Sequence, residues 1–110
     1  MELLNVTVEP AHQQVTVRVR GEIDIATADH LQHILDAALQ EAQVSRLEVD
    51  MSGVRFMDCS GLRALLHAKE RLEKDGGTIT LVNLTPQVDR VLSILGFDHS
   101  LSHNLLDSKA

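Results

Sequence analysis

The sequence predicts an α/β fold, a mixed sheet of four to five strands with helices packed on it. Two patterns along the 110-residue chain predict this fold. Short segments that alternate apolar and polar residues, typical of half-buried strands, are followed by longer segments with apolar residues at helical spacing. Their order is β-β-α-β-α-β-α, and a hairpin followed by right-handed βαβ crossovers gives a sheet with both antiparallel and parallel pairs. We expect one domain, residues 1–110, because a second core would not fit.

The strands are expected where the alternation is clearest. Pro10 lies in the short turn between the first two, which predicts an antiparallel hairpin closed by Gly21. Glu48 and Asp50 in the third strand indicate that one of its faces is not fully buried. The predicted strands are Leu4–Val8, Val15–Arg20, Leu47–Met51 and Thr78–Val82, with one further short strand around Ser100–Ser102.

The helices are expected where leucines and other apolar residues fall on one face. Thr27 is the expected N-cap of the first helix, and Thr85 with Pro86 opens the third. Asp75-Gly76-Gly77 ends the second helix, since these residues tolerate positive φ. The predicted helices are approximately Ala28–Gln43, Gly61–Lys74 and Pro86–Leu95.

The composition excludes several classes of function. The formal net charge is −6 and no cluster of Lys and Arg is present, which argues against nucleic-acid binding. A single Cys excludes an internal disulfide framework and fits a reducing compartment. No segment reaches the roughly 20 apolar residues of a membrane span, and the N-terminus lacks the pattern of a signal peptide. We therefore expect a cytoplasmic protein, without membrane insertion, that acts on other proteins.

The segment Asp58-Cys59-Ser60-Gly61-Leu62 is the most informative part of the chain. It lies where a strand and loop give way to a helix, whose N-terminus carries unpaired N–H groups and partial positive charge. With Phe56-Met57 before it, it resembles the signature of the STAS family of bacterial anti-sigma factor antagonists, which read Asp-Ser-Ser-Gly-Leu or Asp-Ser-Thr-Gly-Leu. A second landmark of that family is Gly21-Glu22-Ile23-Asp24, followed by Thr27.

The resemblance implies a function in partner switching. The antagonist binds an anti-sigma factor that is also a serine kinase, and the sigma factor is released; a phosphatase is a further partner of such a cycle. We expect no enzymatic activity and no cofactor. A fourth helix usually closes the domain in that family, but only residues 104–110 remain for it here, so we expect that helix to be short, frayed or absent. The expected partner-binding residues are Glu22, Asp24, Thr27, Asp58, Cys59, Ser60, Gly61, Leu62 and Arg63.

The chain departs from the family at the phosphorylated position, where Cys59 replaces the usual serine or threonine. Three hypotheses remain open. Ser60, the remaining hydroxyl of the loop, takes the phosphate; or the protein is never phosphorylated and always competent to bind; or Cys59 is a redox sensor, favoured by the helix N-terminus and opposed by Asp58. Purely structural roles are also open: Ser60 as a helix cap, Cys59 as a small buried residue, and Asp58 as an acceptor for loop N–H groups.

We expect the two landmarks to lie at the same end of the sheet, giving one acidic surface suited to a basic patch on a partner. The histidine pairs His30/His33 and His99/His103 do not define a zinc site. Cys59 and Arg63 are too close in sequence for a cysteine phosphatase loop. The main alternative function is a STAS accessory or scaffold subunit of another complex, such as a transport ATPase.

Overall fold

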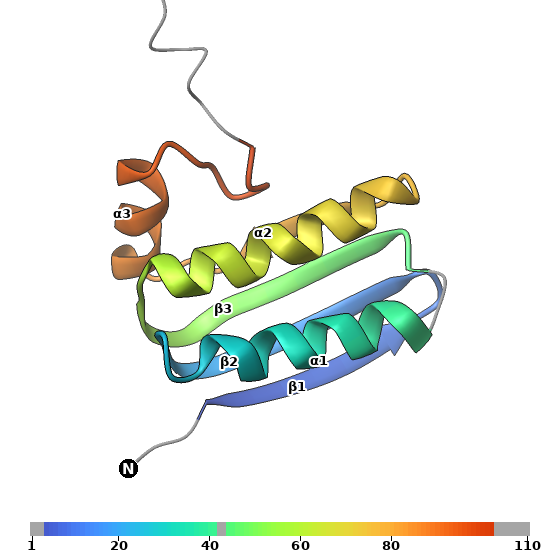
Figure 1. Ribbon diagram of the computed structural model, residues 1–110, viewed down its shortest axis with the longest axis horizontal. Helices are drawn as coiled ribbons and strands as arrows, with labels where there is room; N and C mark the ends of the chain where they lie inside the picture. The colour runs from blue at the N-terminus through green and yellow to red at the C-terminus, as the bar shows by residue number, and fades with distance from the viewer. Residues whose placement is uncertain (1–3, 42–43, 103–110) are drawn as a thin grey trace, which may run out of the picture.

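The computed structural model describes residues 4–41 and 44–102. They form one sheet with the strand order β1-β2-β3-β4 (Figure 1). β1 and β2 are antiparallel, whereas β3 is parallel to both of its neighbours, so the predicted mixed sheet is confirmed. The strands are β1 (Asn5–Ala11), β2 (Gln14–Ile23), β3 (Arg46–Met57) and β4 (Thr78–Val82).

Two helices, α1 and α2, lie side by side over one face of the sheet, and α3 stands beside the N-terminal end of α2 (Figure 1). Leu35 of α1 and Leu65 of α2 are fully buried between the helices and the sheet, together with Val17 and Val49 from the central strands. This layered burial supplies the main driving force for folding. The helices are α1 (Ala28–Glu41), α2 (Cys59–Lys74) and α3 (Pro86–Ile94).

Most of the described helix ends lie where the sequence predicts them. The hydroxyl of Thr85 accepts a hydrogen bond from the Val88 N–H, so the predicted cap of α3 is confirmed. Asp75 ends α2 and is followed by Gly76 at φ 79°, a conformation that glycine adopts without strain. The predicted end of the first helix at Gln43 lies outside the described residues. None of the described helices is long and apolar enough to cross a membrane.

β3 is longer than the alternation predicts. The prediction ended the strand at Met51, but it continues to Met57 along β2. The register between β2 and β3 shifts after Arg18, and a Cβ atom on Gly53 would lie only 2.6 Å from Cγ of Arg20. Gly53, which the sequence pattern placed in a loop, therefore lies within β3, where the absence of a side chain leaves room for Arg20 of β2.

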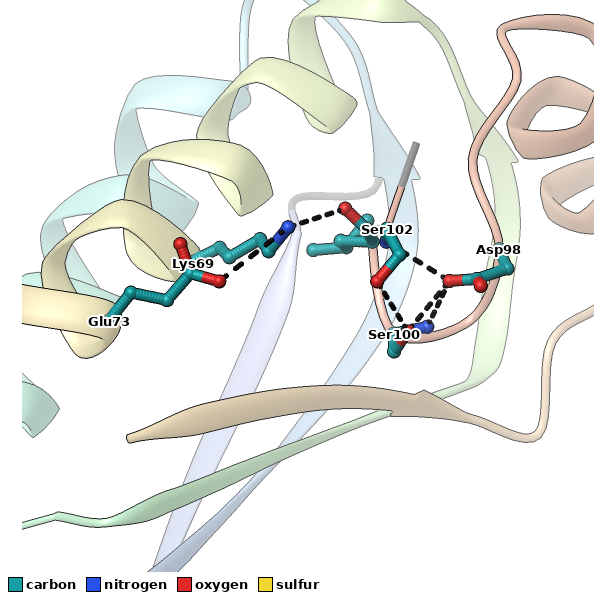
Figure 2. A network of polar contacts seen from close by, with 6 residues as sticks. Lys69, Glu73, Asp98, Ser100 and Ser102 are labelled. Atoms are coloured by element: carbon teal, nitrogen blue, oxygen red, sulfur yellow. Dashed lines mark hydrogen bonds and ion pairs between the residues drawn. The ribbon is translucent and has the colours of Figure 1, made fainter. Parts of the chain in front are cut away.

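The short strand predicted around Ser100–Ser102 is wrong, because these residues form a turn (Figure 2). Oδ1 of Asp98 accepts hydrogen bonds from the N–H groups of Ser100 and Ser102, at 2.9 and 3.0 Å. The turn holds Leu101 at φ 62° with its side chain fully buried. Nζ of Lys69 in α2 donates to the Leu101 carbonyl at 2.9 Å, which ties the turn to the helix layer. The segment after Asn104 lies outside the described residues.

Candidate functional site

The two landmark segments meet at the C-terminal ends of β2 and β3. Ile23 is the register partner of Met57, and the N–H of Asp58 donates to the carbonyl of Ile23 at 3.1 Å. Because β2 and β3 are parallel, the turn that leaves β2 and the turn that enters α2 emerge at the same edge of the sheet. The structure therefore brings the Asp24 turn and the start of α2 together on one end of the molecule.

The Asp24 turn is closed by hydrogen bonds between its own residues. Oδ1 of Asp24 accepts from the N–H groups of Ala26 and Thr27, at 2.9 and 3.2 Å. The hydroxyl of Thr27 accepts from the Asp24 N–H at 3.0 Å and donates to the Glu22 carbonyl at 2.8 Å. Thr27 stands directly before α1, and its carbonyl accepts from the Leu31 N–H at 3.1 Å, as at an N-cap. Its hydroxyl fastens the turn back onto β2. Glu22 is exposed and Asp24 is half-buried.

Asp58, and not Ser60, is the N-cap of α2. Asp58 has extended backbone geometry, and its Oδ1 accepts from the Ser60 N–H at 2.8 Å. Ser60 lies within the first turn and is half-buried. Cys59 is exposed, so the hypothesis that it is a small buried residue is wrong. Since Asp58 occupies the cap, the thiol at the first helical position is left facing solvent.

Gly61, Leu62 and Arg63 divide into packing and surface residues. A Cβ atom on Gly61 would lie 2.6 Å from Cγ of Met57 and 2.7 Å from Cγ2 of Ile23. Leu62 is buried in the core, whereas Arg63 is exposed. Gly61 and Leu62 therefore hold the start of α2 against the strand ends, and the side chain offered to solvent is that of Arg63.

Three residues near this site were not among the predicted site residues. Ile25, in the Asp24 turn, is 83% exposed, and Phe56, the register partner of Glu22, is 41% exposed. Oε1 of Gln87 accepts from the Met57 N–H at 2.9 Å, and Nε2 donates to the Met57 carbonyl at 3.1 Å. Ile25 lies two residues after Ile23 and continues the apolar alternation of β2, so the sequence pattern gave no signal that its side chain is exposed.

Within residues 4–41 and 44–102, no group of three or more His, Cys, Asp or Glu side chains is arranged to hold a metal ion. Nδ1 of His33 lies 3.1 Å from the carbonyl of Asp29 within α1. His103 lies outside the described residues. The features that converge at the strand ends are carboxylates, a thiol, an arginine and exposed apolar side chains, an arrangement typical of a protein-docking surface.

Comparison with known proteins assigns the family. The family described as "Mlab, STAS domain" matches residues 6–107, so the chain belongs to the STAS domain family. An anti-sigma F factor antagonist of Paenibacillus polymyxa is 30% identical over 95 residues, which cover 84% of this chain and 81% of the relative. An anti-sigma-B factor antagonist of Bacillus subtilis (strain 168) is 28% identical over 93 residues, covering 84% of each chain.

A solved structure agrees with these relatives. The crystal structure of an anti-sigma factor antagonist from Mycobacterium paratuberculosis matches with a TM-score of 0.75 and 30% identity, covering 84% of this chain and 78% of that one. The mixed sheet and its helices are therefore the STAS fold, as the two sequence landmarks predicted.

Proposed function

We propose that this chain is an anti-sigma factor antagonist. It binds an anti-sigma factor of the serine-kinase type and so releases the sigma factor, which regulates transcription by partner switching. The names of the relatives support this function, and the observation that carries it is the hydrogen bond between the Asp58 N–H and the Ile23 carbonyl. That bond brings the Asp24 turn and the start of α2 together, which supports one docking surface formed by both. The chain acts as a regulatory binding protein, without catalysis or a cofactor.

The docking surface consists of the exposed or half-exposed residues Glu22, Asp24, Thr27, Asp58, Cys59, Ser60 and Arg63, held in place by Gly61 and Leu62. Its three carboxylates favour a partner with a basic surface, because complementary charge steers association and suppresses wrong partners. Its two turns are closed by internal hydrogen bonds before any partner arrives. A preformed surface of this kind loses little conformational entropy on binding.

Phosphorylation of Ser60 would switch this surface off. A phosphoryl group adds nearly two negative charges beside the Asp58 carboxylate. Because Cys59 faces solvent while Ser60 is half-buried, the position most accessible to a kinase carries a thiol. The same exposure of Cys59 and partial burial of Ser60 also support the competing hypothesis, in which the chain is never phosphorylated and is always competent to bind. Incubation with the kinase and ATP, followed by intact-mass measurement, separates the two: phosphorylation at Ser60 gives a mass gain that Ser60→Ala abolishes.

The binding function is tested with the recombinant anti-sigma factors of the organism that encodes this chain, by isothermal titration calorimetry. We expect the wild-type chain to bind one of them. Glu22→Gln and Asp58→Asn, which keep the side-chain shape, should each weaken binding by roughly threefold to tenfold. Glu70→Gln is the matched control, since Glu70 is an exposed α2 residue about two helical turns beyond Arg63.

The opposite results are equally definite. If no anti-sigma factor binds the wild-type chain, and a transport ATPase subunit does, the chain is a STAS accessory subunit. If Glu22→Gln and Asp58→Asn bind as tightly as Glu70→Gln, the docking surface lies elsewhere on the molecule.

A further inference from the structure

Exposed apolar side chains are unevenly placed on this molecule. Among the residues that the structure describes, the large hydrophobic side chains open to solvent are Val8, Ile25, Phe56 and Ile94. Ile25 and Phe56 both lie where β2 and β3 end, within two residues of the Ile23–Met57 register pair. Ile25 is the most exposed of the four at 83%. A single exposed isoleucine is ordinary on a protein surface, so its setting decides what it does.

The setting of Ile25 is rigid. The residue stands between Asp24, whose Oδ1 accepts from the Ala26 N–H at 2.9 Å, and Thr27, whose hydroxyl bonds to β2. The Ala28 N–H also donates to the Asp24 carbonyl at 2.8 Å. These bonds fix the backbone on both sides of Ile25, so its side chain is held out to solvent before binding. A short, branched side chain on a fixed backbone pays little entropy when it is buried in a complex.

The charges around Ile25 indicate what covers it. Glu22 and Asp24 closely precede it in sequence, and Asp58 is joined to the same strand end through Ile23. An interface anchor is typically an apolar residue that fills a pocket while charged residues surround it at the rim. A pocket that receives Ile25 must therefore be apolar within and bordered by basic residues.

We propose that Ile25 is the apolar anchor of the docking surface, and that it inserts into an apolar pocket with a basic rim on the anti-sigma factor. This inference rests on the proposed function and adds to it the residue that sets most of the affinity. The carboxylates around Ile25 then set the rate and specificity of association, whereas the anchor sets how slowly the complex dissociates.

The test compares two isoleucines in one chain. Ile25→Ser and Ile94→Ser are titrated against the anti-sigma factor that binds the wild-type chain; Ile94, on α3, is 74% exposed and serves as the matched control. We expect Ile25→Ser to weaken binding by at least about tenfold, mainly through faster dissociation, and Ile94→Ser to change it by less than about twofold. Ile25→Leu should retain affinity within about threefold, and the melting temperatures of all variants should match that of wild type.

Each contrary outcome has its own meaning. If wild type binds and Ile25→Ser binds equally well, the anchor is refuted while the proposed function stands. If wild type binds no anti-sigma factor, both fall together. Sedimentation experiments without the anti-sigma factor give a further outcome. If the wild-type chain forms a dimer and the Ile25→Ser variant is a monomer, Ile25 binds a second copy of the chain and the proposal is overturned.

Discussion

Gly61 shows how a single missing side chain positions the site. The start of α2 approaches the ends of β2 and β3 so closely that a Cβ atom would enter the space of Met57 and Ile23, which are both fully buried. The glycine of the signature segment therefore has a packing reason. It allows the N-terminus of α2 to reach the strand ends, and thereby brings Asp58 and Cys59 beside the Asp24 turn.

We predict that Gly61→Ala destabilises the protein by about 1–2 kcal/mol. Alanine in a helix would normally gain up to about 1 kcal/mol over glycine, but overpacking of a dense core costs about 1–3 kcal/mol and outweighs that gain. Urea unfolding measures the difference. Cys59→Ala, in the same helical turn but exposed, should stay within about 0.5 kcal/mol of wild type. An unchanged or higher midpoint for Gly61→Ala would contradict the packing argument.

Asp58 combines a structural role with a proposed role in binding, and two substitutions separate them. Asp58→Ala removes the acceptor for the Ser60 N–H and should cost about 1 kcal/mol of folding stability. Asp58→Asn keeps an oxygen that can accept this bond and should cost less than about 0.5 kcal/mol. Urea unfolding of both variants tests the prediction. Equal losses would mean that the negative charge at the helix N-terminus, and not the cap, stabilises α2.

At the scale of elements, the extension of β3 depends on α3. β4 pairs with β3 only as far as Asp50, opposite Val82, so within the described part of the chain no strand pairs with the far end of β3 on that side. The side-chain amide of Gln87, in the first turn of α3, satisfies both the N–H and the carbonyl of Met57. The Gln87 side chain thus supplies Met57, the residue before Asp58, with the hydrogen bonds that a neighbouring strand would otherwise make.

We predict that Gln87→Ala destabilises the protein by about 1–2 kcal/mol, because it leaves two partly buried backbone groups without their partners. The loss should be local, so the amide hydrogen of Met57 should exchange faster in Gln87→Ala under native conditions. Gln40→Ala, at an exposed position on α1, is the control and should be nearly neutral. Unchanged exchange at Met57 would refute the role of the amide.

At the scale of the whole molecule, two aspartates link folding to pH. The hydroxyl of Ser100 and the N–H groups of Ser102 and Ser100 outweigh burial and hold the pKa of Asp98 below its usual value. Burial raises the pKa of Asp50, but hydrogen bonds from Ser52 and Asn83 and the charge of Arg18 outweigh it and leave the pKa lowered. Both carboxylates therefore favour the folded state in their ionised form.

The stability from these groups is complete above the ordinary aspartate pKa of about 3.9 and is lost as the pH falls through their lower folded values. We predict that the free energy of unfolding decreases as the pH is lowered from about 4 to about 2. The decrease per pH unit should be smaller in Asp98→Asn, because the asparagine side chain does not titrate. Ser100→Ala, which removes one of the bonds, should give an intermediate slope. Urea unfolding at several pH values measures the slopes, and identical slopes in the three proteins would exclude Asp98 as a contributor.

The sequence by itself determined the order of elements, the mixed sheet, the family landmarks and the cap of α3. These depend on local patterns: alternation, helical spacing, and residues such as Thr85-Pro86 whose conformations are set by their own chemistry. It also predicted that the Asp24 turn and the Asp58 segment share one end of the sheet, because consecutive parallel strands bring their C-terminal ends together.

Only the tertiary structure decided the residue-level roles. Asp58 is the cap, Thr27 fastens a turn, β3 runs past Gly53, and the segment at Ser100–Ser102 is a turn around buried Leu101. Each depends on contacts between residues far apart in the chain or on competition between neighbouring acceptors, which no local pattern records. The exposure of Ile25 belongs to the same class, since a side chain is exposed only when every other element has packed elsewhere.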